Sequence, residues 1–298
     1  MFTGCGTALI TPFRQNGSLD EEALQRLITR QIEGDIDFLV PCGTTGESPT
    51  LTREEHLTVV RTCIALTREH GIPVLAGAGG NNTHEVIELA LACQRLGADG
   101  ILSVTPYYNK PTQEGLFQHY QAIAAAIEIP LIVYSVAGRT GVNVEPATLA
   151  RLAGVRRIIG VKEASGNISQ QAAVIHQVPS DFLVLSGDDA ITLPLIALGG
   201  KGLISVASNI IPDQMTQLVR AAMQQDFWRA RELQREWLPL MEVNFIESNP
   251  IPVKAALAAL GLVENVYRLP MVPPRPESLA KIEAVLEASG LLRHMAAR

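Results

Sequence analysis

Eight short apolar runs, each followed by a stretch of helical periodicity, constrain the fold of this 298-residue chain more than any other feature. The runs lie at residues 6–11, 38–41, 73–78, 100–104, 131–135, 158–162, 182–186 and 202–206. Apolar strands that alternate with helices are typical of parallel sheets buried on both faces. Eight such units in about 220 residues match a closed barrel better than an open doubly wound sheet. The sequence therefore predicts an α/β fold, a (β/α)8 TIM barrel.

Polar start signals support the predicted helices. Three pairs of residues have the spacing of a capping box or imitate one: Ser18 with Glu21, Thr52 with Glu55, and Asn82 with Glu85. In a capping box each side chain accepts a hydrogen bond from the backbone N–H of the other residue. These pairs therefore predict where three of the helices begin.

The pattern becomes wholly helical after Met223. Helical periodicity covers residues 227–246, 253–260 and 277–291, and no flexible linker separates these stretches from the apolar runs before them. Domain boundaries usually fall in flexible linkers, so we expect the helices to pack on the barrel. The predicted division is a barrel at residues 1–224 and a C-terminal helical appendage at residues 225–298.

Charge and hydropathy argue against nucleic-acid and membrane partners. The net charge is −6, and the 24 basic residues are scattered without the interleaved aromatic residues expected of a nucleic-acid surface. The N-terminus has no basic segment before its apolar stretch, and Glu128 and Pro130 interrupt the longest apolar region, residues 122–136. We therefore expect a cytoplasmic chain that binds neither nucleic acid nor membrane.

No cofactor motif is visible in the sequence. The four cysteines form no CxxC pair and have no histidine at ligand spacing, which makes a metal site or a disulfide framework a weak interpretation. No HExxH, GxGxxG or GxxxxGKS/T motif occurs. We expect free thiols in a reducing cytoplasm. The chemistry must then come from side chains, or from a cofactor that leaves no motif.

In a (β/α)8 barrel the functional residues follow the carboxyl ends of the strands. The second predicted strand ends in a turn where Thr44 and Thr45 lie between Gly43 and Gly46. Hydroxyls and backbone N–H groups beside glycines suit an anion such as a carboxylate, although an ordinary tight turn explains the residues equally well.

Tyrosines and an arginine follow two further strands. Tyr107 and Tyr108 come after the fourth strand, where they could form a wall of the site, although packing is the favoured explanation. Tyr134 ends the fifth strand, and Arg139 follows it. A tyrosine there can transfer protons, and an arginine can hold a carboxylate through two parallel hydrogen bonds.

The sixth strand carries the strongest signal, because it alone places one of the five lysines, Lys162, on a buried parallel strand. Burial favours the neutral amine, which is the form that attacks a ketone. The alternatives are a lysine whose stem is buried while its head reaches solvent, or an ion pair with Glu163. Since neighbouring strand residues point in opposite directions, Glu163 is a poor partner. Lys162 is therefore the candidate nucleophile.

Six motifs, taken together, resemble a known family. They are Gly43–Ser48 (GTTGES), Tyr107–Asn109, Tyr134, Arg139–Gly141, Val161–Ala164 and Asn249–Lys254 (NPIPVK). In this order they resemble the dihydrodipicolinate synthase family, and the resemblance runs from Phe2 to the helical C-terminus. They are also similar to the wider superfamily of N-acetylneuraminate lyase and keto-deoxy sugar acid aldolases, which share the lysine, the tyrosine and the threonine turn.

The resemblance implies roles for several residues. Lys162 would form a Schiff base with pyruvate, Thr45 would hold the pyruvate carboxylate, and Tyr134 would transfer protons. Thr44 and Tyr108 would complete a hydroxyl relay with Tyr134, Tyr108 reaching in from a neighbouring subunit. The implied enzyme is a homotetramer, a dimer of dimers, and needs no metal or organic cofactor.

The same resemblance implies that Arg139, Gly187 and Ile204 contact substrate. Arg139 would hold the carboxylate of L-aspartate 4-semialdehyde, the second substrate, and sialic acid lyases have no such arginine. The product would be 4-hydroxy-tetrahydrodipicolinate, in the first committed step towards diaminopimelate and lysine. Two residues depart from the family pattern beside this pocket: Ser135 replaces asparagine and Ala137 replaces proline. Losing the proline frees the backbone near Arg139.

Two alternative functions remain at this stage. A pyruvate-dependent lyase or aldolase acting on a sugar acid would need a longer acceptor pocket rich in hydroxyl groups. A non-catalytic barrel retained for binding or assembly would have no physical need for an unpaired lysine on a buried strand.

The resemblance also implies a regulatory site for L-lysine. In lysine-sensitive relatives the inhibitor lies in a cleft between subunits, at positions that match Ser48, Pro49, Arg53, His56, Asn81, Glu85 and Tyr107. Glu85 can pair with an ammonium group, while His56 can donate to a carboxylate. A cation at Arg53 would instead repel the ammonium. These residues have an equally simple structural explanation, in which they cap a helix and solvate an interface.

Overall fold

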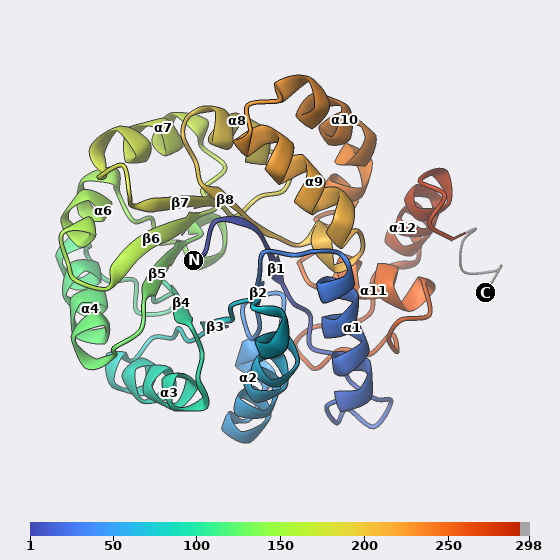
Figure 1. The fold of residues 1–298 in the computed structure, drawn as a ribbon. Helices are drawn as coiled ribbons and strands as arrows, with labels where there is room; N and C mark the ends of the chain where they lie inside the picture. The colour runs from blue at the N-terminus through green and yellow to red at the C-terminus, as the bar shows by residue number, and fades with distance from the viewer. Residues whose placement is uncertain (293–298) are drawn as a thin grey trace.

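The computed structural model describes residues 1–292 and confirms the predicted barrel (Figure 1). Its strands are β1 (Gly4–Ala8), β2 (Phe38–Val40), β3 (Leu75–Gly77), β4 (Gly100–Val104), β5 (Leu131–Ser135), β6 (Ile158–Glu163), β7 (Leu183–Ser186) and β8 (Gly202–Ser205). They pair in the order β2-β1-β8-β7-β6-β5-β4-β3, and the hydrogen-bonded neighbours run parallel. A parallel bridge between Leu39 and Val74 joins the two ends, so the sheet closes on itself.

Helices accompany the strands, and most of them cover the outside of the barrel. They are α1 (Glu21–Glu33), α2 (Arg53–Thr67), α3 (Thr83–Leu96), α4 (Gln113–Ala126), α5 (Ala137–Thr140), α6 (Pro146–Ala153), α7 (Ile168–Gln177), α8 (Thr192–Ala197), α9 (Pro212–Met223), α10 (Phe227–Val243), α11 (Ile251–Ala259) and α12 (Pro276–Ala288). Short 3-10 turns are η1 (Ser48–Thr50), η2 (Arg68–His70) and η3 (Ala207–Asn209). Figure 1 shows α10, α11 and α12 gathered on the side of the ring where α1 and α9 lie.

Buried apolar side chains form two clusters. The cluster inside the barrel includes Phe38, Leu102 and Ile132, which β2, β4 and β5 contribute. The larger cluster lies between the strands and the helices, as expected when parallel strands are covered on both faces. It also contains Leu240 of α10 and Leu257 of α11, so these C-terminal helices share the apolar core of the barrel helices.

The described chain ends at residue 292, and residues 293–298 of the expected C-terminal region lie outside the described residues. Within residues 1–292, no helix is long and apolar enough to cross a membrane.

Local signals at two helix starts are confirmed. The Thr52 side chain accepts from the backbone N–H of Glu55, and the Glu55 carboxylate accepts from the N–H of Thr52, as a capping box requires. Asn82 caps α3 differently. Its side chain accepts from the N–H of His84 and donates to the Glu85 carboxylate, so the predicted start is correct without a reciprocal box.

The predicted box at the start of α1 is wrong. The helix begins at Glu21, and Asp20 is its N-cap, with a side chain that accepts from the N–H of Ala23. The Ser18 hydroxyl donates to Asn16 instead, at 2.7 Å. Aspartate is as good an N-cap as serine. Asp20 directly precedes the first residue of the helix, whereas Ser18 lies two residues earlier.

The first strand is also shorter than predicted, since β1 ends at Ala8 and not at residue 11. The backbone leaves the sheet because the N–H of Ile10 donates to the Asn209 side chain, at 3.1 Å. The Thr11 hydroxyl then donates to Gly46 O, at 2.7 Å, and this bond ties the end of the segment to the threonine turn.

Candidate active site

A cavity of about 300 Å³ opens at the carboxyl ends of β2 to β5. Of the predicted site residues, it is lined by Thr44, Ser48, His56, Tyr107, Tyr134 and Arg139. Pro250, Pro270 and Met271 of the C-terminal region complete its wall. The structure therefore brings together residues from three predicted strand ends, at the face of the barrel where catalysis is expected.

Lys162 lies beside this cavity, next to Tyr134. The two residues are register partners on the neighbouring strands β6 and β5. The Lys162 Nζ atom lies 4.3 Å from the centre of the Tyr134 ring, and only 5% of the lysine is exposed. Within residues 1–292, no carboxylate lies within ion-pair distance of Lys162. The amine is therefore buried against an aromatic face without a counter-ion.

Glu163 points away from Lys162, as the strand alternation predicts. Its carboxylate accepts from Gln170 and Gln171 of α7, at 3.0 and 2.7 Å. Both hydrogen bonds lie on the helix side of the sheet. The structure thus excludes the alternative in which Glu163 pairs with Lys162.

The two other predicted contacts lie deeper in the barrel. A Cβ atom at Gly187 would lie 3.1 Å from Cε of Lys162, and 2.6 Å from the Ala164 side chain. Gly187 therefore leaves the space that the lysine occupies. Ile204 on β8 is buried in the inner apolar cluster. Neither residue lines the cavity itself.

The threonine turn is compact, and three backbone hydrogen bonds close it. The backbone N–H groups of Gly46 and Ser48 both donate to Gly43 O, and the N–H of Glu47 donates to Thr44 O. A Cβ atom at Gly46 would lie 3.0 Å from the backbone of the preceding residues, so a larger side chain fits poorly there. The turn therefore holds in defined positions Thr44, which lines the cavity, and its buried neighbour Thr45, which does not.

Thr45 is buried and has a partner from the far end of the chain. Its Oγ1 accepts from Nδ2 of Asn249, at 2.9 Å. The backbone O of Asn249 accepts from Nη2 of Arg139, at 3.3 Å. Asn249 of the C-terminal region therefore contacts both Thr45, which is predicted to hold pyruvate, and Arg139, which is predicted to hold the semialdehyde.

Glu47 anchors the turn from its other side. It adopts a left-handed backbone conformation, with φ of 50°, and its carboxylate lies 2.6 Å from Nζ of Lys254. Both side chains are buried. Burial lowers the pKa of Lys254, and the charge of Glu47 opposes this shift. The paired charges thus compensate each other in the interior.

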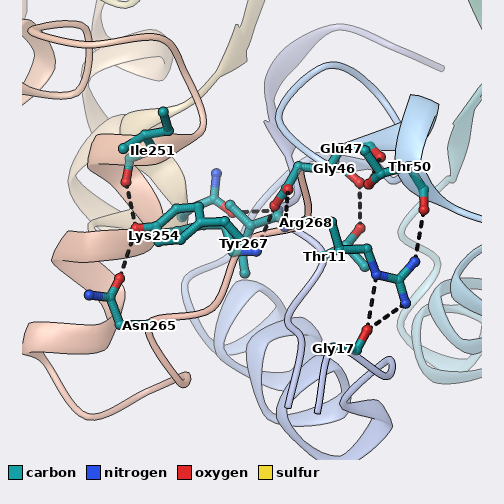
Figure 2. A network of polar contacts seen from close by, with 12 residues as sticks. Thr11, Gly17, Gly46, Glu47, Thr50, Ile251, Lys254, Asn265, Tyr267 and Arg268 are labelled. Atoms are coloured by element: carbon teal, nitrogen blue, oxygen red, sulfur yellow. Dashed lines mark hydrogen bonds and ion pairs between the residues drawn. The ribbon is translucent and has the colours of Figure 1, made fainter. Parts of the chain in front are cut away.

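Figure 2 shows this ion pair within a larger polar network. The ring of Phe13 has its centre 4.3 Å from Nζ of Lys254 and 4.2 Å from Cζ of Arg268. Arg268 donates to both oxygens of Glu55, at 2.6 and 2.7 Å, and also to Thr50 O, at 2.9 Å. Its hydrogen bonds lower the pKa of Glu55. The network fastens the C-terminal region to the segment that follows the threonine turn.

The paired tyrosines have different surroundings. Both of their backbone N–H groups donate to Oδ1 of Asn81, at 2.8 and 3.0 Å. Tyr107 lines the cavity and is 42% exposed, while Tyr108 is 86% exposed and lies outside it. One chain therefore does not bring Tyr108 to the cavity that Tyr134 lines.

The predicted regulatory residues are only partly grouped. Ser48, His56 and Tyr107 line the cavity, whereas Asn81 and Glu85 do not. His56 is buried and its Nε2 lies 2.9 Å from Gly77 O, so this nitrogen donates to a carbonyl. Burial lowers the pKa of His56 to about 4. At neutral pH the imidazole is therefore uncharged and already bonded.

Beside Arg139, the two departures from the family pattern have clear surroundings. Ser135 is buried, and its Oγ accepts from the N–H of Val144, at 3.2 Å. Ala137 begins the short helix α5, which carries Arg139. Both substitutions therefore fit an ordered loop that directs the arginine towards the cavity.

Comparison with known proteins agrees with this geometry. The sequence model of the dihydrodipicolinate synthetase family matches residues 1–289. The chain belongs to this family. It is 54% identical to 4-hydroxy-tetrahydrodipicolinate synthase of Koribacter versatilis, over 98% of this chain and 97% of that protein.

Solved structures of family members share the fold. The dihydrodipicolinate synthase of Thermotoga maritima is 45% identical, with a TM-score of 0.96 over 98% of this chain and all of that one. The chloride-inhibited enzyme of Acinetobacter baumannii, solved with pyruvate, is 42% identical, with a TM-score of 0.96 over 98% of this chain and all of that one.

Two contacts of this family member were not anticipated from the sequence. Asn249 and Lys254 belong to one of the family motifs, but the motif does not predict which residues they contact. Glu47 carried a usable signal, because an acidic residue inside a turn of small residues needs a cationic partner once it is buried. The sequence does not predict which basic residue is that partner.

Among residues 1–292, no group of three or more histidine, cysteine or acidic side chains could hold a metal ion.

Proposed function

We propose that this family member is a 4-hydroxy-tetrahydrodipicolinate synthase, a lyase that condenses pyruvate with L-aspartate 4-semialdehyde in diaminopimelate and lysine biosynthesis. The observation that carries the proposal is Lys162, a buried amine without a carboxylate partner, beside Tyr134 at the cavity. An unpaired buried lysine at a cleft is a candidate nucleophile, because no carboxylate engages its amine.

In the first half-reaction the Lys162 amine attacks C2 of pyruvate and forms a carbinolamine. Loss of water then gives a Schiff base, a covalent link that needs neither a metal nor an organic cofactor. Thr45 and the backbone of the threonine turn hold the pyruvate carboxylate through donated hydrogen bonds. Tyr134, with Thr44, transfers the protons that the carbinolamine and the departing water require.

In the second half-reaction a proton leaves C3 of the Schiff base, and the enamine attacks the aldehyde carbon of the semialdehyde. Arg139 holds the carboxylate of this second substrate through its planar guanidinium. The substrate amine then attacks C2, closes the ring and displaces the Lys162 amine. The cyclic product, 4-hydroxy-tetrahydrodipicolinate, leaves a free lysine for the next turnover. Gly187 and Ile204 shape the floor around the lysine.

Assembly completes the proton relay. Tyr108 is 86% exposed and lies at the tip of the loop after β4, where a second copy can receive it. We propose that it enters the cavity of a neighbouring subunit in a homotetramer built as a dimer of dimers. The barrel at residues 1–224 then supplies the chemistry, and the C-terminal region at residues 225–298 supports it. The four cysteines are buried free thiols, which suits a reducing cytoplasm.

A coupled assay tests this function. Purified enzyme receives pyruvate with L-aspartate 4-semialdehyde, and a dihydrodipicolinate reductase reports the product through oxidation of its nicotinamide cofactor. A parallel assay follows pyruvate release from sugar acids such as N-acetylneuraminate. Turnover in the first assay alone supports the synthase. Turnover in the second alone would assign the chain to the sugar acid lyases instead.

A further inference from the structure

Asn249 occupies an unusual position, because its two polar groups serve the two halves of the site. It is buried and precedes α11. Its side-chain Nδ2 donates to Oγ1 of Thr45, at 2.9 Å, while its backbone O accepts from Nη2 of Arg139, at 3.3 Å. The side chain therefore acts on the proposed pyruvate site, and the backbone acts on the proposed semialdehyde site.

The direction of the first hydrogen bond matters for anion binding. A threonine hydroxyl has one proton and two acceptor lone pairs. When Oγ1 of Thr45 accepts from Asn249, the Thr45 proton stays free to donate to a carboxylate. The reverse orientation of the amide would direct that proton to Oδ1 of Asn249 and away from the cavity. The amide N–H thus selects the hydroxyl rotamer that an anionic substrate needs.

The rest of the segment keeps Asn249 in place. Lys254, five residues later, pairs with Glu47 of the same threonine turn, at 2.6 Å. The backbone N–H of Lys254 donates to Pro250 O, at 3.0 Å, and Pro250 lines the cavity. The segment from Asn249 to Lys254 therefore holds the turn at two points, Thr45 and Glu47. This rigid connection keeps the amide in reach of the threonine.

We propose that Asn249 is a positioning residue that keeps the Thr45 hydroxyl a donor to the pyruvate carboxylate. The proposal rests on the proposed function, and it goes beyond it by giving a side chain of the C-terminal region a defined share of pyruvate binding. Because Arg139 bonds the backbone O of Asn249, which every substitution retains, the two sites can be separated by mutation. Side-chain variants should impair the use of pyruvate and spare the use of the semialdehyde.

Two variants test the direction of the bond. Asn249→Ala removes the donor and should raise the KM for pyruvate about three- to tenfold, the effect of one lost hydrogen bond. Asn249→Asp has the same shape but can only accept, so it turns the Thr45 proton away and adds a repelling charge. Its KM for pyruvate should rise further than that of the alanine variant. The KM for the semialdehyde should stay within about twofold of the wild-type value in both.

A matched control lies in the same region. Asn265 accepts from the Tyr267 hydroxyl, at 2.8 Å, and an aspartate can accept in the same way. Asn265→Asp should therefore keep wild-type kinetics. A double-mutant cycle with Thr45→Ala completes the test: in that background Asn249→Ala should have little further effect on the KM for pyruvate, because its partner is absent. Melting temperatures of all variants report the fold.

Three results would overturn the proposal. They are equal rises in both KM values, an Asn249→Asp enzyme that uses pyruvate as well as the wild type, and additive effects of the Thr45 and Asn249 substitutions. If Asn249→Ala does not fold, the isosteric aspartate variant still decides the question. Failure of the wild-type enzyme to form a borohydride-reducible adduct with pyruvate would instead contradict the proposed function, so the two failures are distinguishable.

Discussion

Two buried lysines, Lys162 on β6 and Lys254 on α11, lie in nearly the same aromatic setting but differ in charge compensation. Each Nζ atom is 4.3 Å from the centre of an aromatic ring, Tyr134 for Lys162 and Phe13 for Lys254. Lys254 also has the Glu47 carboxylate at 2.6 Å, whereas within residues 1–292 no carboxylate pairs with Lys162. The counter-ion, and not the burial, is what separates the two sites.

The difference follows from what each lysine contacts. The buried ion pair of Lys254 and Glu47 joins two parts of the fold, the C-terminal region and the threonine turn. An unpaired lysine is not held by a counter-ion, so its amine is available to attack a ketone. Lys162 also lies beside a cavity of about 300 Å³ that can admit a substrate. We therefore interpret Lys162 as reactive and Lys254 as structural.

The largest expected effect tests the reactive side of this comparison. Lys162→Ala should lower turnover on the order of 10⁴-fold or more, as expected when a covalent nucleophile is removed. Borohydride added with pyruvate should attach a pyruvate-derived mass to the Lys162 peptide of the wild type and to no peptide of this variant. Mass spectrometry of proteolytic peptides measures both. An unchanged label in Lys162→Ala, or a label on Lys254, would reverse the comparison.

The structural side predicts a loss of stability. Lys254→Met should lower the free energy of unfolding by about 3–5 kcal/mol, because it leaves the Glu47 carboxylate buried without a partner. The double variant Glu47→Gln/Lys254→Met should regain much of this loss. Lys162→Met should lower the free energy of unfolding far less, since it leaves no buried carboxylate without a partner. Urea denaturation of the three variants measures the order, and equal losses for the two lysines would contradict it.

Arg139 sharpens the comparison within the site, because it faces the same cavity as Lys162 but serves the other substrate. Arg139→Ala should lower kcat/KM for the semialdehyde by about 10- to 100-fold, as expected for a lost hydrogen bond to a charged group. Borohydride labelling of Lys162 by pyruvate should remain. Arg139→Lys should recover little, because an ammonium cannot form the paired hydrogen bonds of a guanidinium. Parallel loss of labelling and turnover would instead show that Arg139 supports pyruvate binding or the stability of the fold.

A third buried basic side chain, His56, predicts a pH dependence of stability. Burial lowers its pKa from 6.5 to about 4, so the unfolded chain binds the proton more readily. Its contribution to stability is therefore complete above about pH 6.5 and is lost as the pH falls towards about 4. His56→Gln removes the titrating group. Unfolding free energies should fall less steeply over this window in the variant than in the wild type, and identical slopes would contradict the assignment.

The smallest expected effect concerns the mouth of the cavity. We predict weak inhibition by millimolar L-lysine through Ser48, His56, Asn81, Glu85 and Tyr107. Glu85→Ala should relieve the inhibition without loss of uninhibited turnover, because Glu85 lies outside the cavity and can supply the charge for the ammonium. Calorimetry and the coupled assay measure binding and inhibition. If lysine neither binds nor slows the enzyme, the regulatory site is absent, and the assignment of Lys162 stands.

The repeating pattern and the strand ends could be predicted from the sequence because both are local. Apolar runs between helical stretches predicted the eight strands, and the alternation along β6 predicted that Lys162 and Glu163 point in opposite directions. The carboxyl ends of parallel strands meet at one face, so Thr44, Tyr134 and Arg139 could be expected near one another before any coordinates. Local pattern was less reliable at helix ends, where Asp20 and not Ser18 caps α1.

Contacts between distant parts of the chain could be decided only by the tertiary structure. Asn249 meets Thr45 across 204 residues, and Lys254 meets Glu47 across 207. Nothing in the local sequence of α11 encodes these partners, because they depend on where the closed barrel leaves room for the C-terminal helices. The sequence by itself determined that a lysine would be buried on a strand. Packing decided which buried lysine has a counter-ion, since a charge is compensated by whatever the fold brings within about 4 Å of it.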